Sequence, residues 1–272
     1  MRNYRDKTVV ISGAGSGIGR ALALEMARRG ARLALTDING GEVQETAHRC
    51  AALGVQAESW KVDVADRAAM YQHAEDVVER FGGVDVAVNN AGVAIHARTA
   101  ETSDRDFAWI MDINFWGMVH GSKAFLPHLI LSGDGQLANV SSVFGLIAVA
   151  KDGAYNASKF AIRGFTEALR QEVRLDRLPV SVSCIHPGGI KTNIVNNARF
   201  GAGEDGARVA GLFDRFAVTS PEGAARSIVR GLERDRARIL VGPDARLIAA
   251  LPQVFGAQYG RLIEAGLRIA RV

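Results

Sequence analysis

The sequence predicts a parallel α/β fold, and three observations support this prediction. Short runs rich in Val, Leu and Ile alternate along the chain with longer stretches of helical period. The short runs are continuously apolar, as expected of strands that are covered by helices on both faces. The 272 residues are 48% hydrophobic and 23% charged, which is enough apolar material for one large buried core.

Seven segments have the composition of buried strands. Each is short, and most are rich in aliphatic or β-branched residues and followed by a polar or glycine-containing segment. In chain order they are 7–12, 32–36, 56–61, 84–89, 135–140, 180–185 and 238–241.

Six intervening segments have helical period and suitable length. They are 19–29, 41–52, 67–81, 104–131, 154–176 and 221–233. The stretch 191–218 has no clear period and contains four glycines, so we expect a mobile loop with short helices. Because long loops inside compact domains are often lids or binding loops, we interpret about 190–218 as a substrate loop.

The chain end, 244–272, repeats apolar residues at roughly helical spacing with arginines between them. This pattern predicts a helical extension after a single domain that spans residues 1–243. Three roles are open: packing on a neighbouring subunit, covering the substrate site, or resting on an anionic membrane surface. We favour packing on a neighbouring subunit over contact with a membrane.

Charge and cysteine usage narrow the class of protein. The net charge is +4, but basic residues are interspersed with acidic ones, so we expect no nucleic-acid partner. The first residues are charged, and no apolar stretch is long enough to cross a bilayer, so we expect a cytoplasmic protein. Cys50 and Cys184 are far apart and lack metal-ligand spacing, so we expect neither a disulfide nor a metal site.

A glycine-rich segment follows the first expected strand and opens a helix. Gly13 permits a tight turn, Gly17 lets the backbone approach a pyrophosphate, and Gly19 allows the helix to pack closely on the sheet. Ser16 and Ile18 belong to the same loop, where unpaired N–H groups of the helix would face phosphates. The spacing is one residue longer than the common fingerprint, yet its place between strand and helix predicts a dinucleotide cofactor.

Asp37 lies at the end of the second strand, 18 residues after Gly19. A carboxylate here is expected to accept hydrogen bonds from the adenosine ribose hydroxyls. It would repel a 2′-phosphate, and no Arg or Lys occurs between 36 and 42, so NAD is favoured over NADP. The alternative is a turn or capping aspartate, because Asn39 and two glycines follow.

Tyr155 and Lys159 are one helical turn apart and therefore share a face. A nearby ammonium would lower the pKa of the phenol from about 10 and fit the tyrosine for acid–base catalysis. Taken alone, the pair could equally be a solvated helix face.

Taken together, these motifs resemble the short-chain dehydrogenase/reductase family from residue 7 to about 241. The matching motifs are Gly13-x-x-x-Gly17-x-Gly19, Asp63 after the third strand, Asn89-Asn-Ala-Gly92, Asn114, Asn139-Val-Ser-Ser142, Tyr155-x-x-x-Lys159, and Pro187-Gly-Gly-Ile-Lys-Thr192. The resemblance implies a Rossmann-type doubly wound sheet of seven parallel strands, in the order 3-2-1-4-5-6-7, with helices on both faces. It also implies a homotetramer or homodimer.

The resemblance implies four catalytic roles. Tyr155 would exchange a proton with the substrate oxygen, and Ser142 would hydrogen-bond that oxygen. Ser141 competes with Ser142, but the family's interval of thirteen residues before the tyrosine selects Ser142. Lys159 would bind the nicotinamide ribose as well as tune the tyrosine, and Asn114 would anchor a water that relays protons.

The resemblance also implies the cofactor contacts. Asp63 would accept from the adenine amino group, with a backbone contact from Val64; alternatively, Asp63 caps the following helix. The remaining contacts would come from Asn90, Ala91 and Gly92 beside the adenine ribose, and from Pro187, Gly188, Ile190 and Thr192 around the nicotinamide. Such contacts imply transfer of the pro-S hydride.

The function implied is NAD-dependent hydride transfer between a secondary alcohol and a ketone. Apolar residues within 93–97, 143–150 and 190–216 favour a hydrophobic, alicyclic or steroid-like substrate. The alternatives are an NADP-dependent carbonyl reductase and a catalytically silent NAD(P)-binding regulatory protein. The silent protein would not require the four catalytic residues. His96 and His186 are expected to be incidental.

Overall fold

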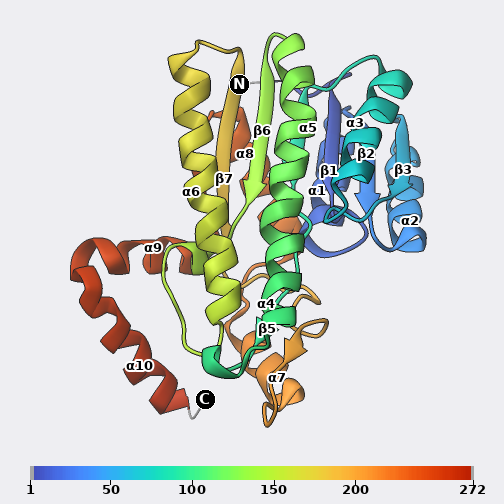
Figure 1. Ribbon diagram of the computed structural model, residues 1–272. Coiled ribbons are helices and arrows are strands. Elements are labelled where there is room, and N and C mark those ends of the chain that lie inside the picture. Colours follow the sequence, from blue (N-terminus) through green and yellow to red (C-terminus); the bar gives the residue numbers. More distant parts are fainter. Residues whose placement is uncertain (1–2, 271–272) are drawn as a thin grey trace.

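The computed structural model describes residues 3–270 and contains a seven-stranded parallel sheet between helices (Figure 1). Its strand order is β3-β2-β1-β4-β6-β7-β9, while β5 and β8 pair separately. Since those two short strands lie outside the main sheet, this order is the predicted one, and the doubly wound fold is confirmed. The strands are β1 (Thr8–Ser12), β2 (Arg32–Asp37), β3 (Ala57–Lys61), β4 (Val86–Asn89), β5 (Ile95–His96), β6 (Gly135–Val140), β7 (Val180–Pro187), β8 (Arg199–Phe200) and β9 (Arg238–Val241).

Helices cover both faces of the sheet. Three pack together on one face: α1 (Gly17–Arg28), α2 (Gly40–Ala51) and α8 (Pro221–Glu233). Three cover the other: α3 (Arg67–Phe81), α5 (Gly117–Leu131) and α6 (Gly153–Leu175). Beyond the carboxyl ends of the strands lie α4 (Asp104–Met111), β5 and α7 (Gly206–Phe216), in the lower part of Figure 1.

The alternation of side chains along β1 shows how the strands join two cores. Val9 and Ile11 are buried against the α1, α2 and α8 side, whereas Val10 is buried on the opposite side. Fully burying such a side chain contributes about 1.5–3 kcal/mol. A continuously apolar strand is therefore required in the middle of the sheet, which explains why the strand pattern could be predicted.

The single helix predicted over 104–131 is divided into three parts. Between α4 and α5, residues Asp112–Trp116 form a π-helical turn, and Asn114 at its centre is fully buried. Such turns insert one residue into a helix and often occur at functional sites. Here the turn directs Asn114 toward the loop that follows β4.

The loop predicted over 191–218 contains regular structure. It includes β8, which pairs in parallel with β5, and α7, whose first turn is capped by Asp205. The predicted helical extension comprises α9 (Pro243–Phe255) and α10 (Tyr259–Ala270), which extend away from the sheet in Figure 1. None of the helices among residues 3–270 is both long and apolar enough to span a membrane.

Candidate active site

The polar motifs gather at the carboxyl edge of the sheet. The glycine loop follows β1, the Asn90–Gly92 segment follows β4, and Ser142 follows β6. The 187–192 segment continues from the end of β7. Because parallel strands end on the same side, topology alone brings these distant segments together where doubly wound folds bind ligands.

The glycine loop is shaped by close backbone approaches. Gly13 and Gly17 have positive φ angles of 64° and 52°, a region that favours glycine. A Cβ at Gly13 would lie 2.7 Å from Ala91 Cα, and one at Gly19 would overlap the Gly13 carbonyl oxygen. Ser16 is the N-cap of α1 but makes no side-chain cap, so the first N–H groups of this helix are available to an anion.

Asn90 and Ala91 hold the glycine loop in place. The Asn90 side-chain amide donates to the carbonyl oxygens of Ser12 at 3.0 Å and Gly13 at 3.1 Å. The backbone N–H groups of Asn90 and Ala91 both donate to the Ser12 hydroxyl. These two residues therefore have a structural role in the loop in addition to the predicted place beside a ribose.

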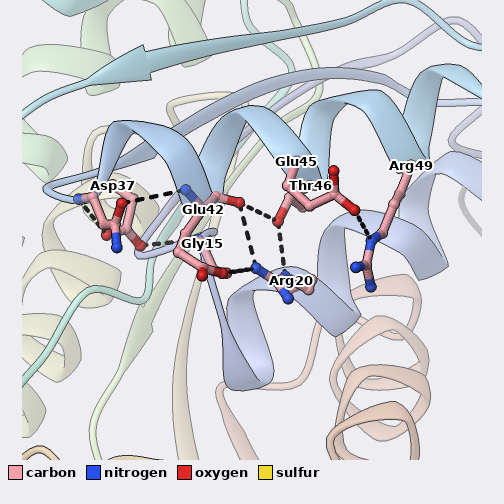
Figure 2. A network of polar contacts seen from close by, with 8 residues as sticks. Gly15, Arg20, Asp37, Glu42, Glu45, Thr46 and Arg49 are labelled. Atoms are coloured by element: carbon pink, nitrogen blue, oxygen red, sulfur yellow. Dashed lines mark hydrogen bonds and ion pairs between the residues drawn. The ribbon is translucent and has the colours of Figure 1, made fainter.

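Asp37 also supports the loop. Its carboxylate accepts from the Gly15 N–H at 2.9 Å and from the Asn39 N–H at 3.0 Å (Figure 2). Arg20 reaches into the same region, donating to the Gly15 carbonyl and pairing with the Glu42 carboxylate. The predicted turn role of Asp37 and a role toward ribose are thus compatible, and Arg20 is a basic neighbour that the 36–42 interval did not include.

Asp63 and Val64 lie after β3, as predicted. Asp63 is exposed and accepts from the Ala65 N–H, whereas Val64 is buried and its carbonyl oxygen lies 3.2 Å from His120 Nδ1. The alternative role of Asp63 as a helix cap is wrong, because Asp66 is the N-cap of α3.

The four predicted catalytic residues lie near one another, Asn114 and Lys159 beside Gly92 and Ser142 beside Tyr155. A Cβ on Gly92 would lie 3.2 Å from Asn114 Oδ1 and 3.4 Å from Lys159 Nζ. Asn114 accepts from the Val93 N–H at 2.8 Å and donates to the Ser158 hydroxyl at 3.1 Å. The Ser142 hydroxyl lies beside the Tyr155 phenol and favours its ionised form.

Ser141 and Ser142 have different surroundings. The Ser141 hydroxyl donates to the Lys159 carbonyl oxygen at 2.8 Å and is therefore occupied within the protein. The Ser142 hydroxyl accepts from the Phe144 N–H at 3.1 Å as well as contacting the phenol. This geometry favours Ser142 as the serine that faces a substrate.

The electrostatics of the pair differ from the sequence prediction. Burial raises the pKa of Tyr155 to about 12, although the neighbouring Ser142 hydroxyl opposes this change. Burial also lowers the pKa of Lys159 to about 8. The ammonium lies 5.5 Å from the centre of the tyrosine ring and donates to the Val140 carbonyl oxygen at 3.2 Å. The predicted lowering of the Tyr155 pKa is therefore wrong for this structure, in which burial raises the pKa instead.

Comparison with known proteins identifies the family. The sequence profile described as short chain dehydrogenase matches residues 7–202, which is most of the chain. The chain belongs to the short-chain dehydrogenase/reductase family.

Relatives and solved structures agree with this assignment. The chain is 49% identical to SadH of Mycobacterium tuberculosis, an oxidoreductase by name, over 98% of this chain and 97% of that protein. It is 31% identical to estradiol 17-beta-dehydrogenase 11 of Mus musculus, over 97% and 84% of the two chains. A short-chain dehydrogenase/reductase from Burkholderia phymatum, solved with NAD, superposes with a TM-score of 0.86 at 28% identity, covering 93% and 95%.

The nicotinamide segment predicted for this short-chain dehydrogenase adjoins the glycine loop. A Cβ on Gly17 would lie 3.2 Å from Thr192 Cγ2, so Thr192 stands beside the phosphate end of the loop. Ile190 is buried and its backbone forms a bridge with Thr219. Pro187 ends β7, and Gly188 donates from its N–H to the Val241 carbonyl at 3.0 Å.

His186 was expected to be incidental, yet it contacts the site. Its Nδ1 lies 2.8 Å from the Ser142 carbonyl oxygen, and the ring is fully buried. Burial lowers the pKa of His186 to about 4, so the ring is neutral near pH 7. Because a carbonyl only accepts, the ring proton must lie on Nδ1. The only sequence signal for this contact was its place at the end of a strand.

The loop over 190–218 is attached to the segment that precedes Tyr155 by β5 and β8. His96 Nδ1 lies 3.1 Å from an oxygen of Asp152, three residues before Tyr155, and Lys151 pairs with Glu204 at 3.1 Å. These contacts connect the loop to the start of α6.

Arg199 in β8 anchors the loop on a second side. Its guanidinium lies 3.6 Å from the centre of the Trp109 ring and pairs with Asp106 at 2.6 Å. The contact network was not predicted, because its members are isolated residues on separate loops.

Proposed function

We propose that this oxidoreductase transfers a hydride between NAD(H) and a hydrophobic secondary alcohol or ketone. The observation that carries the proposal is the placement of the Ser142 hydroxyl beside the Tyr155 phenol. It lies beside a buried lysine and at the same edge of the sheet as the glycine loop. Two hydroxyl groups are thus available to one substrate oxygen.

The residues present fit a dinucleotide. Side chains at Gly13 or Gly19 would fill the space that the loop leaves for close backbone approach, and the N-terminus of α1 has no side-chain cap. The residues that would hold the cofactor are Gly13, Ser16, Gly17, Ile18, Gly19, Asp37, Asp63, Val64, Asn90, Ala91, Gly92, Tyr155, Lys159, Pro187, Gly188, Ile190 and Thr192. When bound, the nicotinamide would supply or accept the hydride.

The protein's own groups would manage the proton. In ketone reduction Tyr155 would donate its phenolic proton to the carbonyl oxygen, while the Ser142 hydroxyl stabilises the developing negative charge. Through its positive charge, Lys159 would favour the phenolate that results. Asn114 retains one lone pair of Oδ1 for a water that returns a proton toward Lys159.

The Asp37 carboxylate supports NAD over NADP, because it would repel a 2′-phosphate. Arg20 is the basic side chain beside it, and its charge is paired with Glu42. An NADP-dependent carbonyl reductase remains the second candidate, since release of Arg20 from Glu42 would provide a cation for that phosphate.

An alicyclic or steroid-like substrate is supported by the apolar neighbours of the tyrosine. Phe144 packs edge-on to Tyr155 with ring centres 5.9 Å apart, and Val93 belongs to the same apolar cluster. The mouse relative's name, an estradiol dehydrogenase, supports the same class.

We further propose a cytoplasmic homotetramer or homodimer. The exposed aromatic side chains of Trp116 and Phe160, near α5 and on α6, support a subunit contact. We retain the division into a domain over 1–243 and an extension over 244–272. Sedimentation of the full chain beside a truncation at Asp244 tests whether the extension joins subunits; an unchanged assembly would refute that role.

The test of function is turnover with NAD(H) and NADP(H) on a panel of alicyclic and steroid alcohols and ketones. The wild type should turn over with NAD(H), whereas Tyr155→Phe should lose activity by about 10²-fold or more. Tyr71→Phe, in α3, is the matched control and should retain activity. Activity that survives Tyr155→Phe would refute the mechanism, and NADH binding without turnover on any substrate would favour a silent regulator. A wild-type preference for NADP(H) would refute the role given to Asp37, which Asp37→Ala tests directly.

A further inference from the structure

Asp244, in the first turn of α9, reaches back to the end of β7. Its Oδ2 accepts a hydrogen bond from the Gly189 N–H at 2.6 Å. Its other oxygen, Oδ1, is shielded from solvent and has no hydrogen-bond partner among the described residues. A carboxylate oxygen that is shielded from water and unpaired is costly to stability, which points to a role for this side chain.

The backbone around Asp244 is shaped to admit this carboxylate. A Cβ on Gly188 would overlap the carboxylate, with the Asp244 Cγ only 2.5 Å away. Gly242 has a positive φ of 102°, and a Cβ there would overlap Asp244 Oδ1 and lie 2.9 Å from the Thr219 hydroxyl oxygen. Two separate glycines therefore leave room for one side chain.

Apart from Asp244, backbone groups hold this segment: the Gly188 N–H donates to the Val241 carbonyl oxygen at 3.0 Å, and the Ile190 side chain is buried. Gly188 and Gly189 are consecutive glycines, which have wide conformational freedom. On the opposite edge, the Gly189 carbonyl accepts from the Thr219 N–H at 3.3 Å, and the Thr219 carbonyl accepts from the Lys191 N–H at 3.0 Å. The bond from Asp244 is the shortest of these contacts, and its acceptor is a carboxylate, so it should be the strongest.

We propose that Asp244 is a positioning residue that holds the Gly188–Ile190 backbone in the conformation that receives the nicotinamide. This inference rests on the proposed function and extends it to α9, a helix beyond the family match at 7–202. Without the carboxylate the Gly189 N–H loses its partner, so binding of the nicotinamide half would have to order this part of the backbone again. The adenosine half, which contacts the glycine loop, is unaffected.

A simpler role for Asp244 is to stabilise the N-terminus of α9, as acidic residues do in the first turn of a helix. Glu222 occupies the first turn of α8, is exposed, and makes no hydrogen bond or ion pair with described residues 187–192. Glu222→Ala is therefore the matched control, because it removes the same kind of helix-end charge without touching the site.

The experiment compares two ligands. NADH carries the nicotinamide and ADP-ribose lacks it, so fluorescence titration with NADH and calorimetry with ADP-ribose separate the two halves of the site. Asp244→Ala should weaken NADH binding about tenfold and leave ADP-ribose binding within about twofold, as expected for loss of one charge-assisted hydrogen bond. Asp244→Asn, which keeps an acceptor but not the charge, should fall between wild type and Asp244→Ala, while Glu222→Ala should match wild type.

Unchanged NADH affinity in Asp244→Ala, or equal weakening of NADH and ADP-ribose, would overturn the inference. If Asp244→Ala does not fold, Asp244→Asn decides the question: weaker NADH binding with unchanged ADP-ribose binding supports positioning, and unchanged NADH binding refutes it. A wild type that binds neither NADH nor NADPH would instead refute the proposed function. This outcome differs from the one that refutes only the role of Asp244, in which wild type and variant bind NADH equally well.

Discussion

Replacing Lys159 with methionine should make the protein more stable at pH 7 while it abolishes activity. Lys159 is 3% exposed, and burial lowers its pKa from 10.5 to about 8. The difference, 10.5 minus about 8, is about 2.5 pH units, which at about 1.4 kcal/mol per unit corresponds to roughly 3 kcal/mol spent in burying the ammonium. Loss of the hydrogen bond to the Val140 carbonyl offsets about 1–2 kcal/mol of the gain.

The pH dependence has a defined sign. Below pH 8 the lysine is charged in both the folded and the unfolded chain, so the full penalty applies. Between about 8 and 10.5 the folded protein has lost the proton while the unfolded chain still binds it, so the wild type gains stability as pH rises. The advantage of Lys159→Met should therefore be about 1–2 kcal/mol at pH 7 and should shrink by pH 9.5, where most tyrosines with an ordinary pKa of about 10 are still protonated.

Urea unfolding at pH 7 and pH 9.5 measures both effects. A variant that is less stable than the wild type at pH 7 would refute the reasoning, because it would mean that the ammonium is stabilised where it lies. A stability difference that does not change with pH would equally refute it.

Three further predictions concern other sites. Gly19→Ala should lower Tm and abolish NADH binding, because the new Cβ would overlap the Gly13 carbonyl oxygen. Gly164→Ala, at an open position of α6, should instead raise Tm by about 2 °C. Equal changes of Tm for the two variants in thermal melts would contradict this expectation. Burial lowers the pKa of His73 from 6.5 to about 4, so the stability linked to its neutral ring is complete above pH 6.5 and is lost as pH falls toward 4. His73→Leu should therefore remove up to roughly 3 kcal/mol of this acid sensitivity of the unfolding free energy, as measured by urea titration. An unchanged pH profile would refute the burial argument. Arg199→Ala should raise KM for the ketone several-fold without changing NADH affinity. The control Arg226→Ala, at an exposed position of α8, should leave KM unchanged. An unchanged KM in Arg199→Ala would show that the Trp109 and Asp106 contacts do not shape the substrate loop.

The fold could be predicted because its determinants are local and repetitive. Central strands such as β1 must be apolar on both faces, and the glycine loop needs glycine at positions that a Cβ would obstruct. Both leave signals in the sequence. The π turn at Asn114 does not, because one inserted residue hardly alters a helical pattern.

The site was predictable only where a motif lies on contiguous residues. Tyr155 and Lys159 share a helix, and their placement together follows from helical spacing. The direction of their pKa changes does not, since burial is a property of the folded environment. His186 and Asp244 act through single contacts with backbone groups that are distant in sequence, and no spacing could indicate those contacts.

The central claim is that Tyr155 provides the proton for a hydride transfer from one face of the nicotinamide. The most direct test is reduction of an alicyclic ketone with (4S)-[4-²H]NADH and, in parallel, with (4R)-[4-²H]NADH. Deuterium should appear at the new carbinol carbon only from the 4S form, and Tyr155→Phe should bind NADH normally while transferring the label at least about 10²-fold more slowly. Label transfer from the 4R form, or an undiminished rate in Tyr155→Phe, would contradict the account.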